Sequence, residues 1–387
     1  MRIVIAPDSL KECLSATKVA KAISSGIKLV YPEAEIIMIP VADGGEGTVE
    51  ALITATSGRI ISTPTVDALN RPIQSFYGIL GNGETAVIEM AAASGIEKIS
   101  PEERNPLITS TFGTGILIKA ALEAGFKKII LGIGGSATND GGAGMAQALG
   151  FGLLNKHGKS IGPGGGSLSE LESIDRKNVH ALLKDAQITV ACDVRNPLLG
   201  SSGATRIYGP QKGATPEMID LLEANLAHFS TIVNHEFGTD WTELPGAGAA
   251  GGLGFGLLNF CDAEIVSGFG LIKEITQLEE HIQHASLVFT AEGKIDSQTA
   301  NGKTISGIAQ LACKHQIPLI ALAGALSGDI GQLQEQGISA VFAIADKPLS
   351  LDESKARAEE LLSQTTAQIM RVIKVGSKIK VGLNFNN

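Results

Sequence analysis

The sequence is poor in aromatic residues and has no excess of basic ones. Only 4% of its 387 residues are aromatic, which leaves little material for the stacking platforms that bind single-stranded nucleic acids. The formal net charge is −9 at pH 7, whereas nucleic acids and anionic membranes attract basic surfaces. We therefore expect neither as a partner. The substrate can still be a small anion, provided that it binds where Lys, Arg and backbone amides cluster locally.

Paired cysteines and long apolar runs are also absent. The four cysteines stand singly, at Cys13, Cys192, Cys261 and Cys313. They form no CxxC pair and lack the histidine spacing of a zinc site. The weakly polar stretch 245–260 is rich in glycine and too short for a membrane span. The apolar run before Pro7 is far shorter than the core of a signal peptide. These features predict a soluble cytoplasmic protein with reduced thiols.

Both ends of the chain alternate strands with helices. An apolar strand at 3–6 precedes a helix that Ser15 is suited to cap, and a strand at 35–41 precedes a helix from about Thr48. The segment 285–345 shows the same order. Nearly continuous apolar strands that alternate with helices predict a parallel sheet covered on both faces.

The middle of the chain has a different pattern. Residues 64–91 alternate between polar and apolar like paired hairpin strands, and glycine-rich segments such as 162–174 follow. The chain is too long for one ordinary core. We expect two α/β domains: a Rossmann- or flavodoxin-like parallel sheet formed by 1–64 and 285–387, and an inserted mixed-sheet domain at 65–284. The active site is expected in the cleft between them. The amphipathic run at 353–375 predicts a packed C-terminal helix.

Polar residues follow most of the predicted strands. Ligands of open parallel sheets bind beyond the carboxyl ends of the strands, so these residues are the candidates for chemistry. They are Asp8, Ser9 and Lys11; Asp43 and Glu46; Ser136 to Asp140; Asp193 and Asn196; and Glu292, Asp296, Gln298 and Thr299. Acidic residues suit a magnesium site or a general base, while lysines and helix N-termini suit phosphate. Each residue alone could instead cap a helix.

Three glycine motifs resemble nucleotide-binding templates without fulfilling them. GIGGSA at 132–137 follows an apolar strand and fits the dinucleotide fingerprint, but the acidic residue expected about 20 positions later is missing. GAGAAG at 246–251 follows WTELP where a strand is required. NGKT at 301–304 ends like a P-loop, although Ser297 stands where a glycine is needed. These departures argue against an NAD enzyme and against a Walker A loop.

The stretch GIGGSATNDGGAG at 132–144 then has two interpretations. Its backbone N–H groups and the hydroxyls of Ser136 and Thr138 could bind phosphate oxygens. Alternatively, its glycines only permit close packing in a tight connection from strand to helix. Asp193 is a candidate general base or metal ligand, or the first residue of an Asx-turn. Lys212 is a candidate phosphate contact or a solvated lysine.

Ten segments, taken in order, resemble the bacterial glycerate kinases of the glyoxylate and galactarate pathways. They are APDSLKECLSA, PVADGGEGT, DALNRP, IEMAAASG, GTGILIKAAL, GIGGSATNDGGAGMAQALG, VACDVRNPLLG, GPQKGA, PGAGAAGGLG and TAEGKIDSQTANGKT. The resemblance implies ATP-dependent phosphorylation of D-glycerate with Mg²⁺ by a two-domain α/β enzyme, giving 2-phosphoglycerate. The chain departs from the family pattern at Leu10, Glu12, Cys13, Ile116 and Ala291.

Phosphoryl transfer requires a phosphate cradle, a metal, a cation and a base. Together with the resemblance, this gives each candidate an expected role. The ATP phosphates are assigned to Gly134, Gly135, Ser136, Thr138 and Asn139, and Mg²⁺ to Asp296 and Glu292. The catalytic residues are Lys11, which neutralises the transferred group, Asp193, which accepts the hydroxyl proton, and Asp8. The glycerate contacts are Arg71 or Lys212 on the carboxylate, with Ser9, Asp43, Glu46 and Asn196.

The partners expected are D-glycerate and ATP, and a homo-oligomer stays open. A kinase for a related hydroxy acid, such as tartronate or erythronate, is the alternative enzyme. A metabolite-binding regulator is the alternative without catalysis.

Overall fold

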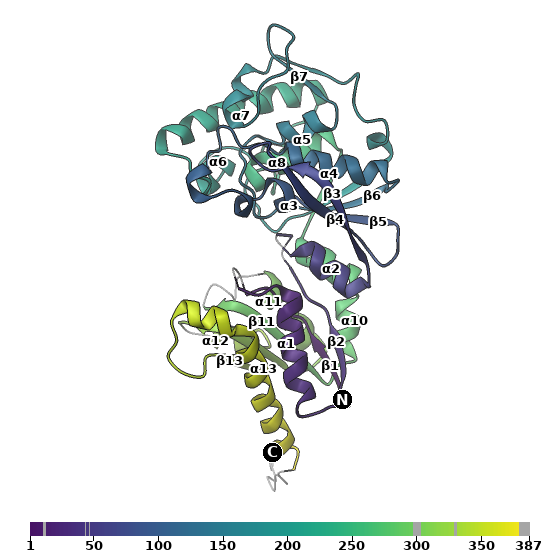
Figure 1. Cartoon of the computed structure of the whole chain (residues 1–387), viewed down its shortest axis with the longest axis vertical. Coiled ribbons are helices and arrows are strands. Elements are labelled where there is room, and N and C mark those ends of the chain that lie inside the picture. The colour runs from purple at the N-terminus through teal and green to yellow at the C-terminus, as the bar shows by residue number, and fades with distance from the viewer. Residues whose placement is uncertain (11–12, 43, 46, 297–302, 329–330, 379–387) are drawn as a thin grey trace. The chain divides into compact units, whose positions relative to one another are not determined.

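The chain forms two compact units, each described here by itself. The computed structural model describes residues 1–10, 13–42, 44–45, 47–296, 303–328 and 331–378. Unit 1 comprises residues 1–42 and 272–387, so both ends of the chain share it, and unit 2 comprises residues 43–271 (Figure 1). Among the described residues, no helix is long and apolar enough to cross a membrane.

The two boundaries between the units lie at 42/43 and 271/272, earlier in the sequence than the expected boundaries at 64/65 and 284/285. Strand β3 (Arg59–Val66) pairs with β4 (Pro72–Ile79) along its whole length, and the Val49 N–H of α2 (Thr48–Thr56) donates to Glu89 at 2.6 Å. Both elements are therefore bound to the sheet of unit 2. The second boundary falls within α9 (Gly268–Ile275).

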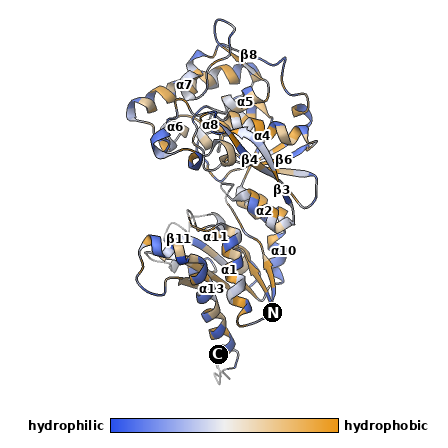
Figure 2. Ribbon diagram, viewed as in Figure 1, coloured by the Kyte–Doolittle hydropathy of each residue, from blue (hydrophilic) through white to orange (hydrophobic). Residues whose placement is uncertain are grey.

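Unit 1 is built on a five-stranded parallel sheet with the order β13-β12-β11-β1-β2. Its strands are β1 (Arg2–Ile5), β2 (Glu35–Met38), β11 (Leu287–Ile295), β12 (Leu319–Leu326) and β13 (Ala340–Ala343). Counted along the chain this is the order 2-1-3-4-5 of flavodoxin-like sheets. Ile3, Val4 and Ile5 are successive residues that point to alternate faces, and all are fully buried. Both faces of the sheet are therefore covered, as the apolar strands predict (Figure 2).

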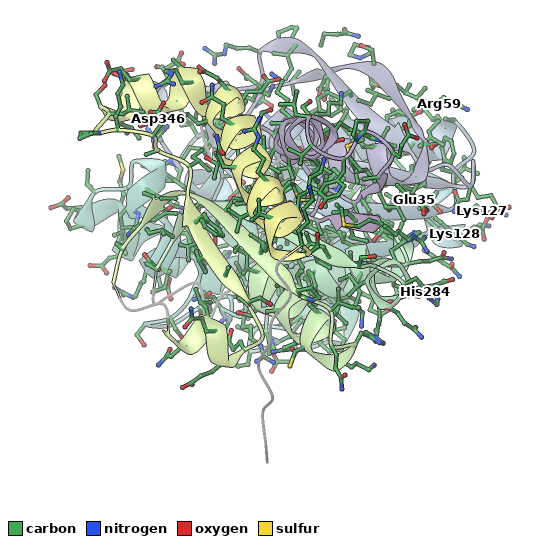
Figure 3. The ribbon with its side chains drawn as sticks, turned by 90° about the horizontal axis from the view of Figure 1, so that it is seen from below. Glu35, Arg59, Lys127, Lys128, His284 and Asp346 are labelled. Carbon is green, nitrogen blue, oxygen red and sulfur yellow. The ribbon has the colours of Figure 1, made fainter. Side chains whose placement is uncertain are left out.

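Helices α1 (Ala16–Lys28) and α13 (Leu351–Gly376) pack together in unit 1. Ser15 caps α1 by accepting a hydrogen bond from the Lys18 N–H at 3.4 Å, as the sequence predicts. A Cβ on Gly26 would lie 2.3 Å from the Ser363 carbonyl oxygen, so glycine permits the close approach of the two helices. Figure 3 shows α13 lying across the sheet, with Asp346 beside its first turns.

The remaining helices of unit 1 are α10 (Leu278–Gln283), α11 (Lys303–Lys314) and α12 (Gly331–Glu335). Glu279 of α10 forms an ion pair at 2.6 Å with Lys314 of α11. This contact ties the segment after α9 to unit 1.

Unit 2 contains a six-stranded mixed sheet with the order β10-β9-β6-β5-β4-β3. The strands not yet defined are β5 (Thr85–Glu89), β6 (Lys128–Gly132), β9 (Gln187–Ala191) and β10 (Glu264–Val266). These four strands are parallel to one another. Strand β4 pairs antiparallel with β5, and β3 pairs antiparallel with β4. A small antiparallel pair joins β7 (Gly152–Leu154) to β8 (Ser173–Asp175). The mixed second domain predicted from the sequence is confirmed.

The helices of unit 2 surround this sheet and share one large core. Besides α2 and α9 they are α3 (Ala91–Ser94), α4 (Phe112–Glu123), α5 (Ala143–Ala148), α6 (Ala204–Tyr208), α7 (Pro216–Phe237) and α8 (Ala249–Phe260), with short 3₁₀ turns such as η5 (Pro210–Lys212).

Helix α8 begins with a left-handed turn. Ala250, Gly251 and Gly252 have φ values of 54°, 67° and 88°. Gly251 accepts a hydrogen bond from the Gly141 N–H at 3.0 Å, and a Cβ on Gly251 would lie 2.0 Å from the Thr138 carbonyl oxygen. Glycine is required here by both conformation and space, because this turn packs directly on the loop at 138–141.

We predict that Gly251→Ala destabilises unit 2 far more than Gly238→Ala. Both glycines have φ of +67°, but a Cβ on Gly238 would meet nothing within 4 Å. Gly238→Ala should therefore lower the free energy of unfolding by the backbone strain alone, about 1–2 kcal/mol. Gly251→Ala adds a clash with the backbone. Urea denaturation followed by the fluorescence of Trp241, the single tryptophan, measures both. Equal losses would contradict the close packing.

Candidate functional site

The topology of unit 1 marks one place for a ligand. Strand β1 lies between β2 and β11, so the chain order reverses there, and ligands of open parallel sheets bind beyond the carboxyl ends of the strands at such a switch point. Asp8 follows β1, and its N–H donates to the Ala291 carbonyl of β11 at 2.9 Å. Its Oδ1 accepts from the Ser9 N–H at 2.6 Å. The structure thus places Asp8 and Ser9 at the switch point.

Glu292 and Asp296 lie on the neighbouring strand. Glu292 was expected in a loop after a strand, but β11 continues to Ile295 because residues 292–295 stay paired with β12. Glu292, Lys294 and Asp296 therefore alternate onto one side of the chain. Lys294 Nζ lies 2.8 Å from Asp296 Oδ2. Glu292 and Asp296 are both partly exposed.

The chemistry of these side chains fits Mg²⁺. The Asp8 N–H bonds to Ala291, the residue before Glu292. Carboxylate oxygens are the protein ligands that this hard cation prefers. Within the described residues no group of three or more acidic, histidine or cysteine side chains is already gathered for a metal. Mg²⁺ needs only one or two protein carboxylates when phosphate oxygens and waters complete its octahedron.

In unit 2 two glycine loops meet at the carboxyl ends of β6 and β9. The Gly134 N–H donates to the Gly44 carbonyl at 3.1 Å. A Cβ on Gly134 would lie 2.5 Å from Gly45 Cα, and one on Gly132 would lie 2.6 Å from the Gly44 oxygen. Close packing between backbones, one of the two interpretations of this loop, therefore accounts for Gly132 and Gly134.

The backbone donors of Gly135 and Ser136 have no partner among the residues that the structure describes. Gly135 is exposed and has φ of +74°. Within the described chain, the N–H groups of Gly135 and Ser136 make no hydrogen bond. In the expected phosphate cradle, these two groups are donors that stay without an acceptor among the described residues.

Thr138 and Asn139 point into unit 2 and do not fit the expected direct contact with phosphates. Both are fully buried. Asn139 Nδ2 donates to Thr205 Oγ1 at 3.0 Å, and the Thr138 carbonyl accepts from Lys212 Nζ at 2.8 Å. The Asn139 side chain thus joins the loop to α6 through Thr205, while Thr138 Oγ1 has no partner among the described residues.

Asp140 anchors the loop. Its fully buried carboxylate accepts hydrogen bonds from the N–H and the hydroxyl of Thr111, at 2.8 and 2.9 Å, and from the N–H groups of Gly142 and Gly144 at 3.2 Å. Burial raises the pKa of Asp140, and these hydrogen bonds oppose the rise. Its oxygens thus hold the starts of α4 and α5, as a capping residue would.

Lys212 lies in the interior of unit 2 and is not a solvated lysine. It is 2% exposed, and its Nζ donates to Ser136 Oγ at 2.6 Å. Burial lowers the pKa of Lys212 to about 7, and the nearby Asp140 charge opposes the change. Its contact with a substrate carboxylate stays a prediction.

Asp193 follows β9 and accepts hydrogen bonds at the start of α9. Its Oδ1 accepts from the Ser267 hydroxyl at 2.9 Å, and its Oδ2 accepts from the Phe269 N–H at 3.3 Å. Asn196 uses both ends of its amide: Nδ2 donates to the Ser202 carbonyl at 2.7 Å, and Oδ1 accepts from the Tyr208 hydroxyl at 2.9 Å. Both residues have structural contacts, and their chemical roles stay predictions.

Arg71 is held by two carboxylates. Its Nε lies 2.6 Å from Asp67 Oδ2 and its Nη1 lies 2.6 Å from Glu103 Oε1. The hydrogen bonds that Arg71 donates raise its pKa, and the bond to Asp67 contributes most. A substrate carboxylate would have to share this guanidinium with both acids. Five further expected residues lie outside the described residues: Lys11, Asp43, Glu46, Gln298 and Thr299.

The sequence analysis missed the contacts that organise the loop. The bond between Lys212 and Ser136 joins residues 76 positions apart, and nothing in the spacing predicts it. Glu89 was also missed. It is buried at the end of β5 and accepts the Val49 N–H of α2. An acidic residue that ends an apolar strand, as in TAVIE, is the signal that could have indicated it.

A separate hollow in unit 2 has a volume of about 540 Å³. Its lining residues are Val66, Asn70, Ser110, Phe112, Gln147, Phe151, Ser160, Ile161 and Pro163. None is charged and none belongs to the expected site. This lining does not suit an anionic acid or a nucleotide.

Comparison with known proteins assigns the chain. The sequence profile of the glycerate kinase family matches residues 3–374. A Bacillus subtilis protein described as glycerate kinase is 49% identical over 97% of this chain and 98% of its own length. An Escherichia coli protein described as glycerate 2-kinase is 48% identical over 98% and 99%.

A solved structure from Salmonella typhimurium LT2, whose description names a glycerate kinase 2, superposes with a TM-score of 0.87. The two proteins are 44% identical, and the similarity covers 98% of this chain and 100% of that one. Family, relatives and fold thus agree over nearly the whole length, and the chain belongs to the glycerate kinase family of enzymes.

Proposed function

We propose that this kinase transfers a phosphoryl group from ATP to D-glycerate, with Mg²⁺, and releases 2-phosphoglycerate and ADP. The observation that carries the proposal is the full-length similarity at 48% identity to a protein described as glycerate 2-kinase. The carboxylates at the switch point of unit 1 support it, because their oxygens suit the metal that accompanies ATP. The single free cysteines agree with a cytoplasmic location.

In the proposed mechanism, unit 1 supplies carboxylates and unit 2 supplies hydrogen-bond donors. Asp296 and Glu292 hold Mg²⁺, which when bound neutralises charge on the phosphates, and Asp8 orients groups beside them. Gly135 and Ser136 donate to oxygens of a bound anion. Such contacts accelerate the reaction because donors fixed in advance stabilise charge as it develops.

The remaining roles concern glycerate, the acceptor of the phosphoryl group. Asp193 accepts the proton of the attacking hydroxyl, and Lys11 neutralises the transferred group. Arg71 binds the carboxylate with its planar guanidinium, which suits both oxygens at once. Ser9, Asp43, Glu46 and Asn196 contact the hydroxyl groups of glycerate.

The product is expected to be the 2-phosphate. Phosphorus NMR of the reaction of D-glycerate with MgATP should show one phosphomonoester signal that matches 2-phosphoglycerate. A signal of 3-phosphoglycerate would refute the regiochemistry. Faster turnover of tartronate or erythronate would refute the substrate, and ligand binding without ADP would indicate a regulator.

Asp193→Asn tests the general base. We expect kcat to fall by about 10²–10⁴-fold, since this is the usual contribution of a positioned base, while the amide retains much of the contact with α9. Ser267→Ala is the matched control, because it removes a hydrogen-bond partner of Asp193 and leaves the carboxylate. If both variants lose the same modest fraction of kcat, Asp193 only caps α9.

Glu292→Gln and Asp296→Asn test the metal site. Each should raise the Mg²⁺ concentration needed for half-maximal rate, because an amide is a weaker ligand than a carboxylate. Asp346→Asn is the control, since Asp346 is an acid of the same unit that pairs with Arg357 at 2.8 Å. An unchanged Mg²⁺ requirement in both site variants would remove these residues from the metal site.

A further inference from the structure

The hydroxyl proton of Ser136 has no acceptor among the residues that the structure describes. Its Oγ accepts a hydrogen bond from Lys212 Nζ at 2.6 Å. An ammonium group has only donors, so while Lys212 is protonated the hydroxyl is the acceptor in this bond and its own proton points elsewhere. In the described part of the chain that proton has no acceptor. Ser136 is 6% exposed, so the hydroxyl lies at the edge of the protein interior.

Two backbone donors stand next to this hydroxyl. The N–H groups of Gly135 and Ser136 likewise have no partner among the described residues. Gly135 has the left-handed conformation, with φ of +74°, which is typical of backbone segments whose successive N–H groups bind an anion. The hydroxyl and the two amides form a donor set without acceptors among the described residues.

Lys212 places a buried positive charge behind this donor set. No carboxylate within the described chain lies within ion-pair distance of its Nζ. Asp140 acts on it electrostatically, but the oxygens of Asp140 are occupied by Thr111, Gly142 and Gly144. A buried charge without a direct partner is costly. An anion bound through Ser136 would compensate it.

We propose that Lys212 is a positioning residue that fixes the Ser136 hydroxyl as a donor to an oxyanion of the bound ligand. This rests on the proposed function. The oxyanion is either the carboxylate of the acid or a phosphate of ATP, which share this chemistry. Lys212 reaches the ligand only through Ser136, because its own amine is buried and also binds the Thr138 carbonyl.

The test measures binding without turnover. Isothermal titration calorimetry gives the Kd of D-glycerate alone and of ATP alone for wild type, Ser136→Ala, Lys212→Met and the double variant. We expect each single variant to lose about tenfold or more in affinity for one ligand, the size of a hydrogen bond to a charged group. The ligand that loses affinity identifies the source of the oxyanion. The double variant should lose no more than either single one.

Thr109→Val is the matched control. Thr109 Oγ1 donates to the Ala137 carbonyl at 2.8 Å, so this variant loosens the same loop without removing a ligand donor. Both affinities should stay near the wild-type values. Additive losses in the double variant, or a loss in Ser136→Ala with none in Lys212→Met, would overturn the proposal, as would an equal loss in Thr109→Val.

If Lys212→Met does not fold, ligand affinity measured over a series of pH values tests the role of Lys212. Burial lowers the pKa of Lys212 to about 7, and the neutral amine can accept the Ser136 proton. Wild-type affinity for the ligand should therefore fall as the pH rises above about 7, and Ser136→Ala should lack this fall. The same slope in both proteins would overturn the proposal. Normal binding of both ligands without phosphoglycerate would instead refute only the proposed function.

Discussion

The buried carboxylate of Asp140 determines the path of the glycine loop on which the site of unit 2 depends. It binds Thr111 before α4 and the N–H groups of Gly142 and Gly144 at the start of α5. Removing such an acceptor would leave several buried donors unpaired, which costs far more than one hydrogen bond contributes. Because the loop is fixed at this end, the exposed Gly135 and the buried Ser136 that follows it are held beyond the carboxyl end of β6.

In both sheets the candidate polar residues lie beyond the carboxyl ends of the parallel strands. In parallel strands the polar residues that follow each strand gather at one edge. Unit 1 gathers Asp8 and Glu292 at its switch point, and unit 2 gathers Ser136 and Asp193. Carboxylate oxygens such as those of unit 1 suit a metal, and hydrogen-bond donors such as those of unit 2 suit an anion, as the proposed reaction requires.

Much of the fold could be predicted from periodicity. The parallel sheet of the chain ends, the hairpin at 64–91 and the C-terminal helix are local patterns, and they are confirmed. The expected boundaries at 64/65 and 284/285 differ from those of the two units. At the first boundary, α2 and β3 are bound to the sheet of unit 2 through the Val49–Glu89 bond and the β3–β4 pairing.

The loops of the candidate site could be predicted from the sequence, but the directions in which their side chains point could not. Spacing indicated Ser136, Thr138 and Asn139 together, yet the side chains of Thr138 and Asn139 are fully buried. The path of the loop depends on Asp140, and the cation behind it comes from Lys212, far along the chain. Such contacts between distant segments leave no periodic signal in a sequence.

The central claim is that the protein couples ATP to glycerate, and the stoichiometry of wild-type turnover tests it most directly. ADP and phosphoglycerate should form in equal amounts, only when D-glycerate and MgATP are both present. Release of ADP without D-glycerate, or no ADP with it, would contradict the account.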